Sequence, residues 1–568
     1  MANYYTDNKD LAFIVERVVD WPAILALKED FGSPDCPWSG PDEAKATFVE
    51  MLRDPVGEIA ANRIAPRAEE VDDIGCRFDA GRVIFPDALE RNLKDLRDAQ
   101  LMGMTIPRRY GGLQFPETVY TAAIEIISQA DASLMNFFGL QGGIAETIAQ
   151  FASEELKERY LPRMSTGEFT GAMALTEPDA GSDLAAVQTR AKDASGGEGI
   201  AARQDPTTGQ WTISGTKRFI TNGCGDVILV LARSEDPEKK GGGRGLSFFL
   251  VEKNPRVRVR RIEHKLGIHG SPTCELYFDE CPAWLIGARG MGLARYTAWL
   301  MLAARLAIGA QALGIAQAAL AEAEAYARQR EQFGRPIREM PQVAAMLADM
   351  RMLAEAARAV LYATSEIVDL HQGAEVRGLK EETRRYGRLA EALTPIAKYY
   401  TTEAANRICY DSLQVHGGNG FMQEYPIERL YRDVRITNIY EGTSQIQINW
   451  AIPRLVRGDL DDLMGALAAR EYADADLARL HQEVLRSYEV YKSVIAWLRE
   501  KDNSFREMTG PQVIDIFVEI YAAFLLLRHA ELWDHKRAVA ARFIRRLGPR
   551  VAMNRDLVLN ARLETLEA

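Results

Sequence analysis

The chain changes its hydrophobic pattern twice along its length. From about residue 41 to 168, and again from about 290 to 456, apolar residues recur at three- and four-residue spacing, which predicts helices. Between these regions, short β-branched runs such as "WTISGTKRFITNG" are bounded by Gly and Asn, which predicts strands up to about residue 282. Helices, then strands, then helices again indicate an α+β protein and not alternating βαβ units.

Two terminal regions flank this pattern. Residues 1–40 combine a short apolar helix candidate with a stretch rich in Pro and Gly, which indicates an arm joined by a linker. A last helical region follows residue 456. The predicted segments are an N-terminal arm (1–40), an N-terminal helical domain (41–168), a middle β domain (169–282), a helical bundle domain (283–456) and an additional C-terminal helical domain (457–568).

Length, composition and charge exclude several classes of protein. A chain of 568 residues is too long for one ordinary core. The net charge of -11 argues against a general nucleic-acid binder. We expect no membrane span, because no apolar run approaches the roughly 20 residues required, and we find no secretory or transit signal. Six scattered cysteines without a CxxC pair indicate reduced thiols in the cytoplasm and no metal site.

One acidic residue has unusual neighbours. Glu441 is the only acid in "ITNIYEGTSQIQINW", where it stands between Tyr440 and Gly442. The residues alone leave two interpretations open. Glu441 is either a structural acid near a helix N-terminus, favoured by the helix dipole, or a desolvated carboxylate whose raised pKa suits it to act as a base. Single acids of this kind are more often structural.

Five motifs occur in a fixed order along the chain. They are "ALTEPDAGSD" (174–183), "GTKRFITNG" (215–223), "RQREQFGRPI" (328–337), "QVHGGNGF" (414–421) and "RDVRITNIYEGTSQIQ" (432–447). Together they resemble the acyl-CoA dehydrogenase family of flavoproteins over about residues 41–456. The arm and the C-terminal region resemble the longer members, which include enzymes acting on methylthiopropionyl-CoA and the very-long-chain dehydrogenases. The resemblance implies a β-barrel-like middle domain between helical domains.

The resemblance also implies a reaction. The family oxidises a saturated acyl-CoA to the trans-2-enoyl-CoA, with FAD as cofactor and electron-transfer flavoprotein as acceptor. Glu441 matches the base that removes the α proton, while the β hydrogen leaves as hydride to flavin N5. The Glu441 N–H is implied to bind the thioester carbonyl, as in an oxyanion hole. Some members carry another catalytic Glu just before the position of Arg305, but this chain has Ala304 there.

Eleven residues match cofactor contacts of the family. Thr176 and Ser182 belong to a loop that crosses the flavin, Thr221 matches the partner of flavin N5, and Phe219 stands where many members have Trp. Each also fits an ordinary turn, strand or solvated helix face. The implied FAD-binding residues are Thr176, Ser182, Phe219, Thr221, Arg330, Phe333, Gln414, Gly417, Gly418, Thr443 and Gln445.

Six residues match the substrate side. They are Met135, Phe138, Gly139, Arg305, Tyr440 and Gly442. Phe138 fits a plain core position equally well. Gly442 lets the backbone approach the thioester without a Cβ in the way. The acyl group stays open among linear, branched, cyclic, thioether and dicarboxylic types.

The sequence also leaves other functions and partners open. Some relatives with added C-terminal domains are DNA-binding, adaptive-response-like flavoproteins, and only the basic stretch 536–555 favours that function. The same stretch fits an amphipathic membrane or partner helix, or a basic face that packs on the acidic body of the protein. An acyl-CoA oxidase differs in oxygen access to the flavin, and a desulfinase-like variant lacks the carboxylate of Glu441. FAD bound between two chains, together with the additional domain, favours a homodimer.

Overall fold

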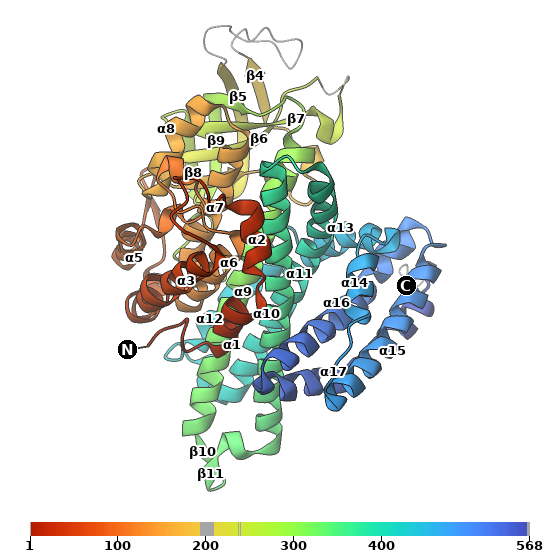
Figure 1. Cartoon of the computed structure of the whole chain (residues 1–568). Coiled ribbons are helices and arrows are strands. Elements are labelled where there is room, and N and C mark those ends of the chain that lie inside the picture. The colour runs from red at the N-terminus through yellow and green to blue at the C-terminus, as the bar shows by residue number, and fades with distance from the viewer. Residues whose placement is uncertain (1, 194–209, 237, 239, 565–568) are drawn as a thin grey trace. The chain divides into compact units, whose positions relative to one another are not determined.

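The structure is a computed structural model that describes residues 2–193, 210–236, 238 and 240–564. Its helices and strands are labelled in Figure 1. The chain divides into two compact units. The first contains residues 1–4 and 50–307, and the second contains residues 5–49 and 308–568. The boundaries of the five segments predicted from the sequence stay a prediction.

The first unit combines helices with one large sheet. Helix α3 (Pro41–Met51) leads into it, and the N-terminal part of α9 (Ala298–Gln329) leaves it. Its other α-helices are α4 (Ala68–Ile74), α5 (Asp87–Asp98), α6 (Glu117–Ala130), α7 (Ala132–Phe151) and α8 (Glu154–Ser165). Asp131 caps α7 by accepting a hydrogen bond from the Ser133 N–H at 2.8 Å, which explains where this helix begins.

The sheet of the first unit closes on itself. A separate hairpin consists of β1 (Arg77–Asp79) and β2 (Arg82–Ile84). The strands of the main sheet are β3 (Gly171–Ala174), β4 (Arg190–Asp193), β5 (Gln210–Thr221), β6 (Val227–Arg233), β7 (Leu246–Glu252), β8 (Val257–Ile262) and β9 (Thr273–Ile286). The order along the sheet is β3-β6-β4-β5-β9-β7, and β7 also pairs with β6. Strands β6, β4, β5, β9 and β7 therefore form a ring, which confirms the predicted β-barrel-like middle domain.

Strand β6 is packed on both of its faces. Ile228 and Val230 join the cluster inside the barrel, whereas Leu229 and Leu231 join a second cluster with Ile144 of α7. This division follows the two-residue period of a strand. All seven positions of β6 are buried, as expected where helices cover the outer face of a sheet. Figure 1 shows α8 beside the strands of the main sheet.

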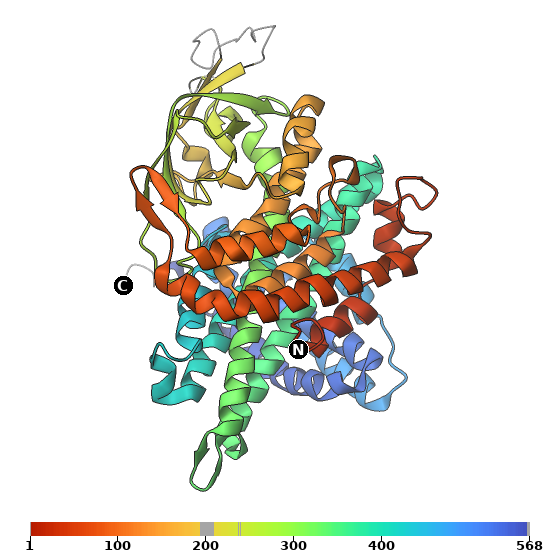
Figure 2. The same cartoon turned by 90° about the vertical axis from the view of Figure 1, so that its left-hand side faces the viewer.

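The second unit is almost entirely helical. Its α-helices are α1 (Lys9–Phe13), α2 (Trp21–Lys28), residues 41–49 of α3, the C-terminal part of α9, α10 (Pro341–Val376), α11 (Lys380–His416), α12 (Ile427–Val434), α13 (Ser444–Arg457), α14 (Asp461–Ala468), α15 (Ala475–Leu498), α16 (Asn503–Leu532) and α17 (Arg537–Leu559). A short hairpin of β10 (Glu331–Gln332) and β11 (Arg335–Pro336) joins α9 to α10. It forms the tip at the lower end of these two helices in Figures 1 and 2.

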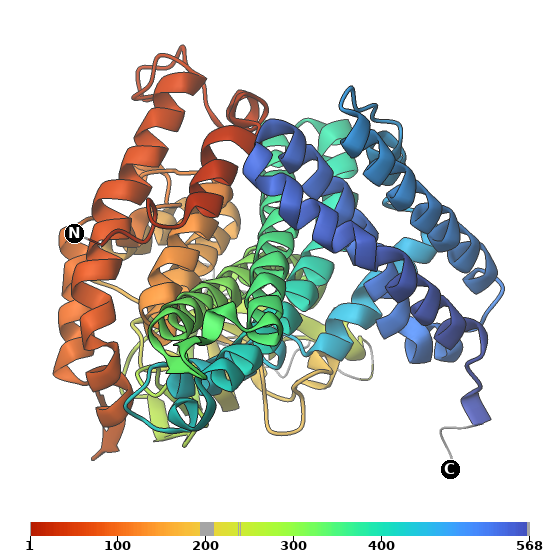
Figure 3. The same cartoon turned by 90° about the horizontal axis from the view of Figure 1, so that it is seen from below.

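The N-terminal arm packs against the C-terminal helices of the same unit through buried charges. Lys536 forms ion pairs with Asp10 and with Glu355, the latter at 2.7 Å, and Arg358 also pairs with Asp10. Burial by itself would raise the pKa of Asp10, but the two cations lower it to about 2. Figure 3 shows the red arm beside the blue C-terminal helices. The arm is therefore fixed to its own chain.

The basic stretch 536–555 is used for ion pairs within the chain. Its apolar side chains Phe543 and Leu547 are buried. Six of its seven basic residues form ion pairs, namely Lys536 with Asp10 and Glu355, Arg537 with Asp474, Arg542 and Arg546 with Asp349, Arg550 with Glu519, and Arg555 with Asp556. This arrangement supports the interpretation that the stretch packs on the acidic body of the protein.

Two helical segments pass a length and composition test for a membrane span. They are Gly292–Gln329 and Asn503–Leu532, and each contains an 18-residue window of sufficient hydropathy. The expectation that no apolar run approaches this length was therefore too strict. However, 83% and 78% of the two windows are buried, as in the core helices of soluble proteins, which pass the same test. This result is weak evidence for a membrane span.

Candidate functional site

A buried ion pair holds the loop that contains the motif "ALTEPDAGSD". Lys217 of β5 is wholly buried, and its Nζ lies 2.8 Å from Glu177 Oε1 and 2.9 Å from the Leu175 carbonyl oxygen. The Glu177 carboxylate also accepts hydrogen bonds from the N–H groups of Gln188 and Thr189, at 2.7 and 2.9 Å. Because a buried charge requires partners, this network fixes both ends of the loop.

Lys217 and Glu177 each affect the pKa of the other. Burial lowers the pKa of Lys217 to about 8, and Glu177 opposes that shift. Burial also acts to raise the pKa of Glu177, but the Lys217 ammonium and the loop donors hold this pKa below its ordinary value. The pair is therefore ionised near neutral pH.

Strand β5 is bulged next to this loop. The register with β9 shifts between Lys217 and Ile220, and Phe219 there has a φ of 60° and is 53% exposed. A left-handed conformation at a non-glycine residue costs about 1–3 kcal/mol and is typical of functional sites. The Arg218 N–H donates to the Thr176 carbonyl oxygen at 2.9 Å, which places the loop beside the bulge. Plain strand alternation does not describe this segment.

The other motif hydroxyls of the first unit differ in exposure. Ser182 is exposed, while Thr176 and Thr221 are partly buried, and Thr221 pairs with Thr273 of β9. The bulge, the exposed ring of Phe219 and these hydroxyls form one side of a candidate cofactor site. Among the contacts of the described residues, those that place the motif beside the bulge involve Thr176 and not Ser182, so the place of Ser182 in this site stays a prediction.

The predicted acyl-side residues of the first unit lie in its interior. Met135 and Phe138 of α7 are wholly buried, and the ring of Phe138 packs 5.0 Å from the ring of Tyr120. Gly139, on the same helix, is also buried. Arg305 of α9 is 6% exposed, as expected for a cation in an apolar helix. The packing of Phe138 is that of a core residue, and its contact with an acyl group stays a prediction.

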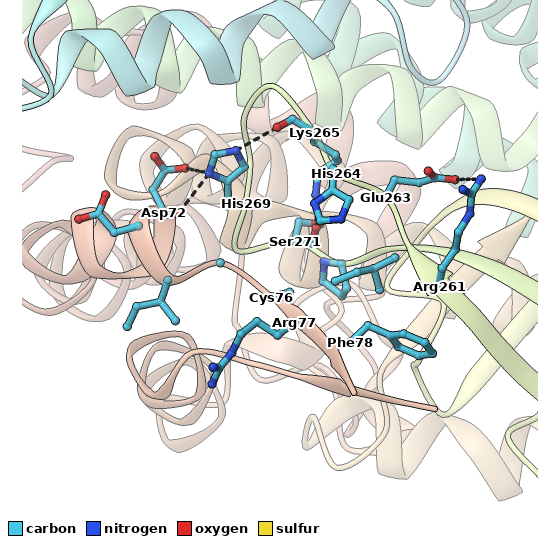
Figure 4. Close-up of a pocket in the computed structure, with 15 residues that line it drawn as sticks. Asp72, Cys76, Arg77, Phe78, Arg261, Glu263, His264, Lys265, His269 and Ser271 are labelled. Atoms are coloured by element: carbon cyan, nitrogen blue, oxygen red, sulfur yellow. Dashed lines mark hydrogen bonds and ion pairs between the residues drawn. The ribbon is translucent and has the colours of Figure 1, made fainter. Parts of the chain in front are cut away.

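A pocket of about 670 Å³ lies elsewhere in the first unit (Figure 4). Its wall is formed by residues 72–78, residues 261–265, His269, Ser271 and Pro272, and it includes none of the predicted site residues. His269 Nδ1 lies 2.9 Å from Asp72 Oδ1, and its Nε2 lies 3.1 Å from the Lys265 carbonyl oxygen. The hydrogen bond to Asp72 raises the pKa of His269.

The loop along this pocket connects two elements that carry predicted site residues. The Asn222 N–H, next to Thr221, donates to the Pro272 carbonyl oxygen at 2.9 Å. Asn136 of α7 donates from Nδ2 to Ser271 Oγ, also at 2.9 Å. The loop therefore braces the end of β5 against α7. This brace could not be predicted from the sequence, because its residues carry no distinctive spacing.

In the second unit, Glu441 lies in a turn that precedes helix α13. Thr443 is the N-cap of this helix, and its Oγ1 accepts a hydrogen bond from the Ile446 N–H at 3.4 Å. The first turn of α13 contains no acidic residue. Glu441 is therefore outside the helical turn in which the dipole would stabilise a structural acid. Gln445, on the first turn, is exposed.

The turn has a strained backbone that two buried side chains support. Glu441 has a φ of 54° and Gly442 a φ of 89°. Lys398 of α11, which is wholly buried, donates from Nζ to the carbonyl oxygens of Tyr440 at 2.9 Å and Gly442 at 2.6 Å. Gln447 donates from Nε2 to the carbonyl oxygens of Glu441 at 2.9 Å and Gly442 at 3.0 Å. Three consecutive carbonyl groups are thus fixed.

Two further contacts hold the segments on either side of the turn. Glu403 of α11 accepts hydrogen bonds from Ser444 Oγ at 2.6 Å and from Asn438 Nδ2 at 3.1 Å. The Tyr440 hydroxyl is hydrogen-bonded to Gln311 Oε1. These supports were not predicted from the sequence. A signal for Lys398 exists in the run "LTPIAKYY", where a single cation stands among apolar residues of a helix.

The remaining predicted cofactor residues of this unit are on its surface. Phe333, at the tip of the β10–β11 hairpin, is 93% exposed, and Arg330 is exposed beside it. Gln414, Gly417 and Gly418 are also exposed, at the end of α11. A Cβ built at either glycine would meet no atom within 4 Å. These residues leave open surface where a bound group or another chain fits.

Comparison with known proteins identifies the family. The N-terminal, middle and C-terminal domain models of acyl-CoA dehydrogenase match residues 49–168, 172–281 and 289–455. The chain belongs to the acyl-CoA dehydrogenase family. It is similar to 3-methylmercaptopropionyl-CoA dehydrogenase of Ruegeria pomeroyi, with 34% identity over 83% of this chain and 78% of that protein. It is 38% identical to an acyl-CoA dehydrogenase of Bacillus subtilis over 70% of this chain and 95% of that one.

A solved structure extends the likeness in fold to the added C-terminal region. The Bacillus anthracis acyl-CoA dehydrogenase complexed with FAD covers 92% of this chain and 90% of its own, with a TM-score of 0.75 and 24% identity. Because the three domain models place the chain in the acyl-CoA dehydrogenase family, the protein is an FAD-dependent oxidoreductase of that type. Its donor set fits FAD, since hydroxyls and an exposed aromatic ring in one unit suit a flavin, and Arg330 in the other suits a pyrophosphate.

Proposed function

We propose that this dehydrogenase removes the α proton of an acyl-CoA thioester with the carboxylate of Glu441. The observation that carries the proposal is the left-handed turn at Glu441 and Gly442, fixed by Lys398 and Gln447. Strain of this kind persists where the surrounding structure over-determines it, and it is common where a reacting group must be aimed. Bound FAD would accept the β hydrogen as a hydride.

The neighbourhood of Glu441 supports the role of a base. Tyr440 is partly buried, and burial raises the pKa of its hydroxyl, so that it stays neutral beside the carboxylate. A substrate that covers Glu441 would remove water from it and raise its pKa toward that of a carbon acid. We also assign the Glu441 N–H to the thioester carbonyl, where it would stabilise the enolate oxygen. In this assignment Tyr440, Gly442, Arg305, Met135, Phe138 and Gly139 bind the substrate.

The cofactor is proposed to lie between two chains of a homodimer. Thr176, Ser182, Phe219, Thr221, Thr443 and Gln445 would contact it from one chain, and Arg330, Phe333, Gln414, Gly417 and Gly418 from the other. A phenyl ring that is 93% exposed supports this proposal, because large exposed apolar side chains often mark an interface. Light scattering after gel filtration should give the mass of a dimer. A monomer that retains FAD would contradict the assignment.

Electron-transfer flavoprotein is the proposed acceptor and the cytoplasm the proposed location. DNA binding has no structural support, because the basic stretch that suggested it forms ion pairs with acids of its own chain. An oxidase differs from a dehydrogenase in one measurable property. Substrate-reduced enzyme should be reoxidised slowly by oxygen and rapidly by electron-transfer flavoprotein, and the reverse order would identify an oxidase.

The acyl group is proposed to be a short apolar or thioether chain. The relative from Ruegeria pomeroyi is named for a thioether substrate, and the residues proposed for the acyl side are apolar. An anaerobic titration with linear, branched, cyclic, thioether and dicarboxylic acyl-CoAs, followed at the flavin absorption band, tests both reaction and substrate. One class should bleach the flavin. If no thioester bleaches protein that is fully loaded with FAD, the proposed function is wrong.

A further inference from the structure

Lys398 occupies an unusual position behind the turn of Glu441. It lies on α11, it is wholly buried, and its Nζ donates hydrogen bonds to the carbonyl groups on both sides of the residue assigned as the base. A neutral side chain is sufficient to anchor a turn, as Gln447 does at the same place. Lys398 differs from Gln447 in bringing a positive charge to the carbonyl groups that it contacts.

We propose that Lys398 is a positioning residue that polarises the peptide between Tyr440 and Glu441 and so strengthens the Glu441 N–H as a donor to the substrate. This inference rests on the proposed function. The peptide is trans and planar, so its carbonyl group and its N–H point to opposite sides. Lys398 contacts the carbonyl oxygen at 2.9 Å. The N–H is then directed away from Lys398, toward the side assigned to the thioester.

The physical basis is the polarisation of one hydrogen bond by another. An ammonium group that binds an amide oxygen draws electron density toward that oxygen and makes the N–H of the same amide a stronger donor. The effect is larger inside a protein than in water, because the local dielectric constant is low. A stronger donor stabilises the enolate more than the neutral thioester, since the negative charge develops on the thioester oxygen. Lys398 therefore acts on the transition state through the backbone.

The same lysine fixes the direction of this N–H. Its second hydrogen bond, to the Gly442 carbonyl oxygen at 2.6 Å, bridges the turn across Glu441. Glu403, five residues further along α11, holds Ser444 and Asn438 at the two ends of the segment. Helix α11 thus supplies both the charge and the frame. The structure assigns these supports to one rigid element, which keeps the donor from turning away from the substrate.

The test compares methionine substitutions of two side chains that anchor the same turn, Lys398 of α11 and Gln447 of α13. Lys398→Met removes the charge and the contact with the Tyr440 carbonyl group. Gln447→Met removes a neutral anchor of Glu441 and Gly442 but leaves the contact between Lys398 and Tyr440. Each variant is loaded with FAD and mixed anaerobically with the acyl-CoA that reduces the wild type. We expect Lys398→Met to slow flavin reduction by about tenfold or more. Removing an oxyanion-hole donor completely slows a reaction further, by about 10²–10³-fold.

A second measurement does not depend on flavin reduction. A 3-oxoacyl-CoA ionises to an enolate when it is bound, and its absorbance against pH gives the apparent pKa of that ionisation. Lys398→Met should raise this pKa, while Gln447→Met should shift it much less. Equal shifts in the two variants would overturn the inference and leave only anchoring. If Lys398→Met fails to fold, Lys398→Gln, which retains a neutral donor, is used in its place, and a wild-type enolate pKa in that variant would also overturn it.

These outcomes are separate from those of the proposed function. If wild-type protein loaded with FAD is bleached by no acyl-CoA, the function itself fails. If the wild type is bleached and Lys398→Met behaves in the same way, the function stands and only the role of Lys398 fails. Flavin content, measured for every sample, shows whether a variant has lost its cofactor site instead.

Discussion

Two buried lysines of this protein hold two loops in different ways. Lys217 meets the Glu177 carboxylate at 2.8 Å, so that a charge of opposite sign lies against it. Lys398 donates to main-chain carbonyl oxygens on both sides of Glu441. Both side chains are wholly buried, and burial alone does not distinguish them. The partner does: the first lysine closes an ion pair that shapes a loop, and the second directs its charge into peptide groups next to the proposed base.

The largest effect in this comparison is expected from Lys217→Met. The substitution leaves the Glu177 carboxylate buried without its cation, and breaking a buried ion pair in this way costs about 3–5 kcal/mol. We expect a clear drop in the thermal midpoint and loss of FAD, measured as flavin per chain after gel filtration. Lys217→Met combined with Glu177→Gln should recover part of both, because no buried charge remains. A single variant with wild-type stability and full FAD would show that the pair does not hold the loop.

A smaller effect is expected from Ser444→Ala. This change removes the hydrogen bond from Ser444 Oγ to Glu403, which is 2.6 Å long and contributes about 1.5–3 kcal/mol as a bond to a charged group. The turn should loosen, and flavin reduction by acyl-CoA should slow several-fold while FAD content stays constant. Ser493→Ala is the control, since Ser493 is exposed on α15 and bonds only within its own helix in the contacts observed. Equal rates in the two variants would remove Glu403 from the frame of the turn.

The smallest effect concerns two buried acids of α16, Asp515 and Glu519, which an arginine approaches. Burial raises the pKa of Glu519 to about 7, against an ordinary value of 4.5, although Arg550 lies 3.0 Å away and opposes this shift. Burial also raises the pKa of Asp515 to about 6. Its carboxylate accepts a hydrogen bond from the Tyr399 hydroxyl at 2.9 Å.

The sign of the resulting pH dependence follows from linkage. Because the folded protein binds these protons more tightly than the unfolded chain, the stability from Glu519 falls as pH rises from about 4.5 to 7, and it is constant above that. The thermal midpoint of the wild type should thus fall more steeply over this range than that of Glu519→Gln. Differential scanning at several pH values measures both slopes. Identical slopes would mean that Glu519 titrates normally.

Much of the fold could be predicted from the sequence, because periodicity reports it directly. The short apolar run "VILVLAR" and the three- and four-residue spacing of apolar residues in the long helices predict the helix–sheet–helix order. Closure of the barrel was implied only by the family resemblance, because the pairing of β6 with β7 depends on contacts that no local pattern encodes. The packing of the arm could not be predicted, since Asp10 and Lys536 lie far apart in sequence.

The candidate site, like the fold, could be predicted only in part from the sequence. Motif order was enough to single out Glu441, Thr176, Thr221 and Arg330, because reactive groups sit in short, distinctive segments. The supports were not predicted, because the single cation in "LTPIAKYY" indicates a buried charge at Lys398 but not the carbonyl groups that it contacts. The bulge at Phe219 was also missed, since a register shift leaves no mark on a strand of β-branched residues.

The central claim is that Glu441 is the base, and one measurement tests it directly. Wild-type protein and Glu441→Gln, both loaded with FAD, are mixed anaerobically with the acyl-CoA that reduces the wild type, and the rate of flavin bleaching is followed. We expect Glu441→Gln to keep its FAD and to lose about 10²–10⁴-fold or more in rate, because the base that takes the α proton is gone. Bleaching of Glu441→Gln at the wild-type rate would show that Glu441 is not the base.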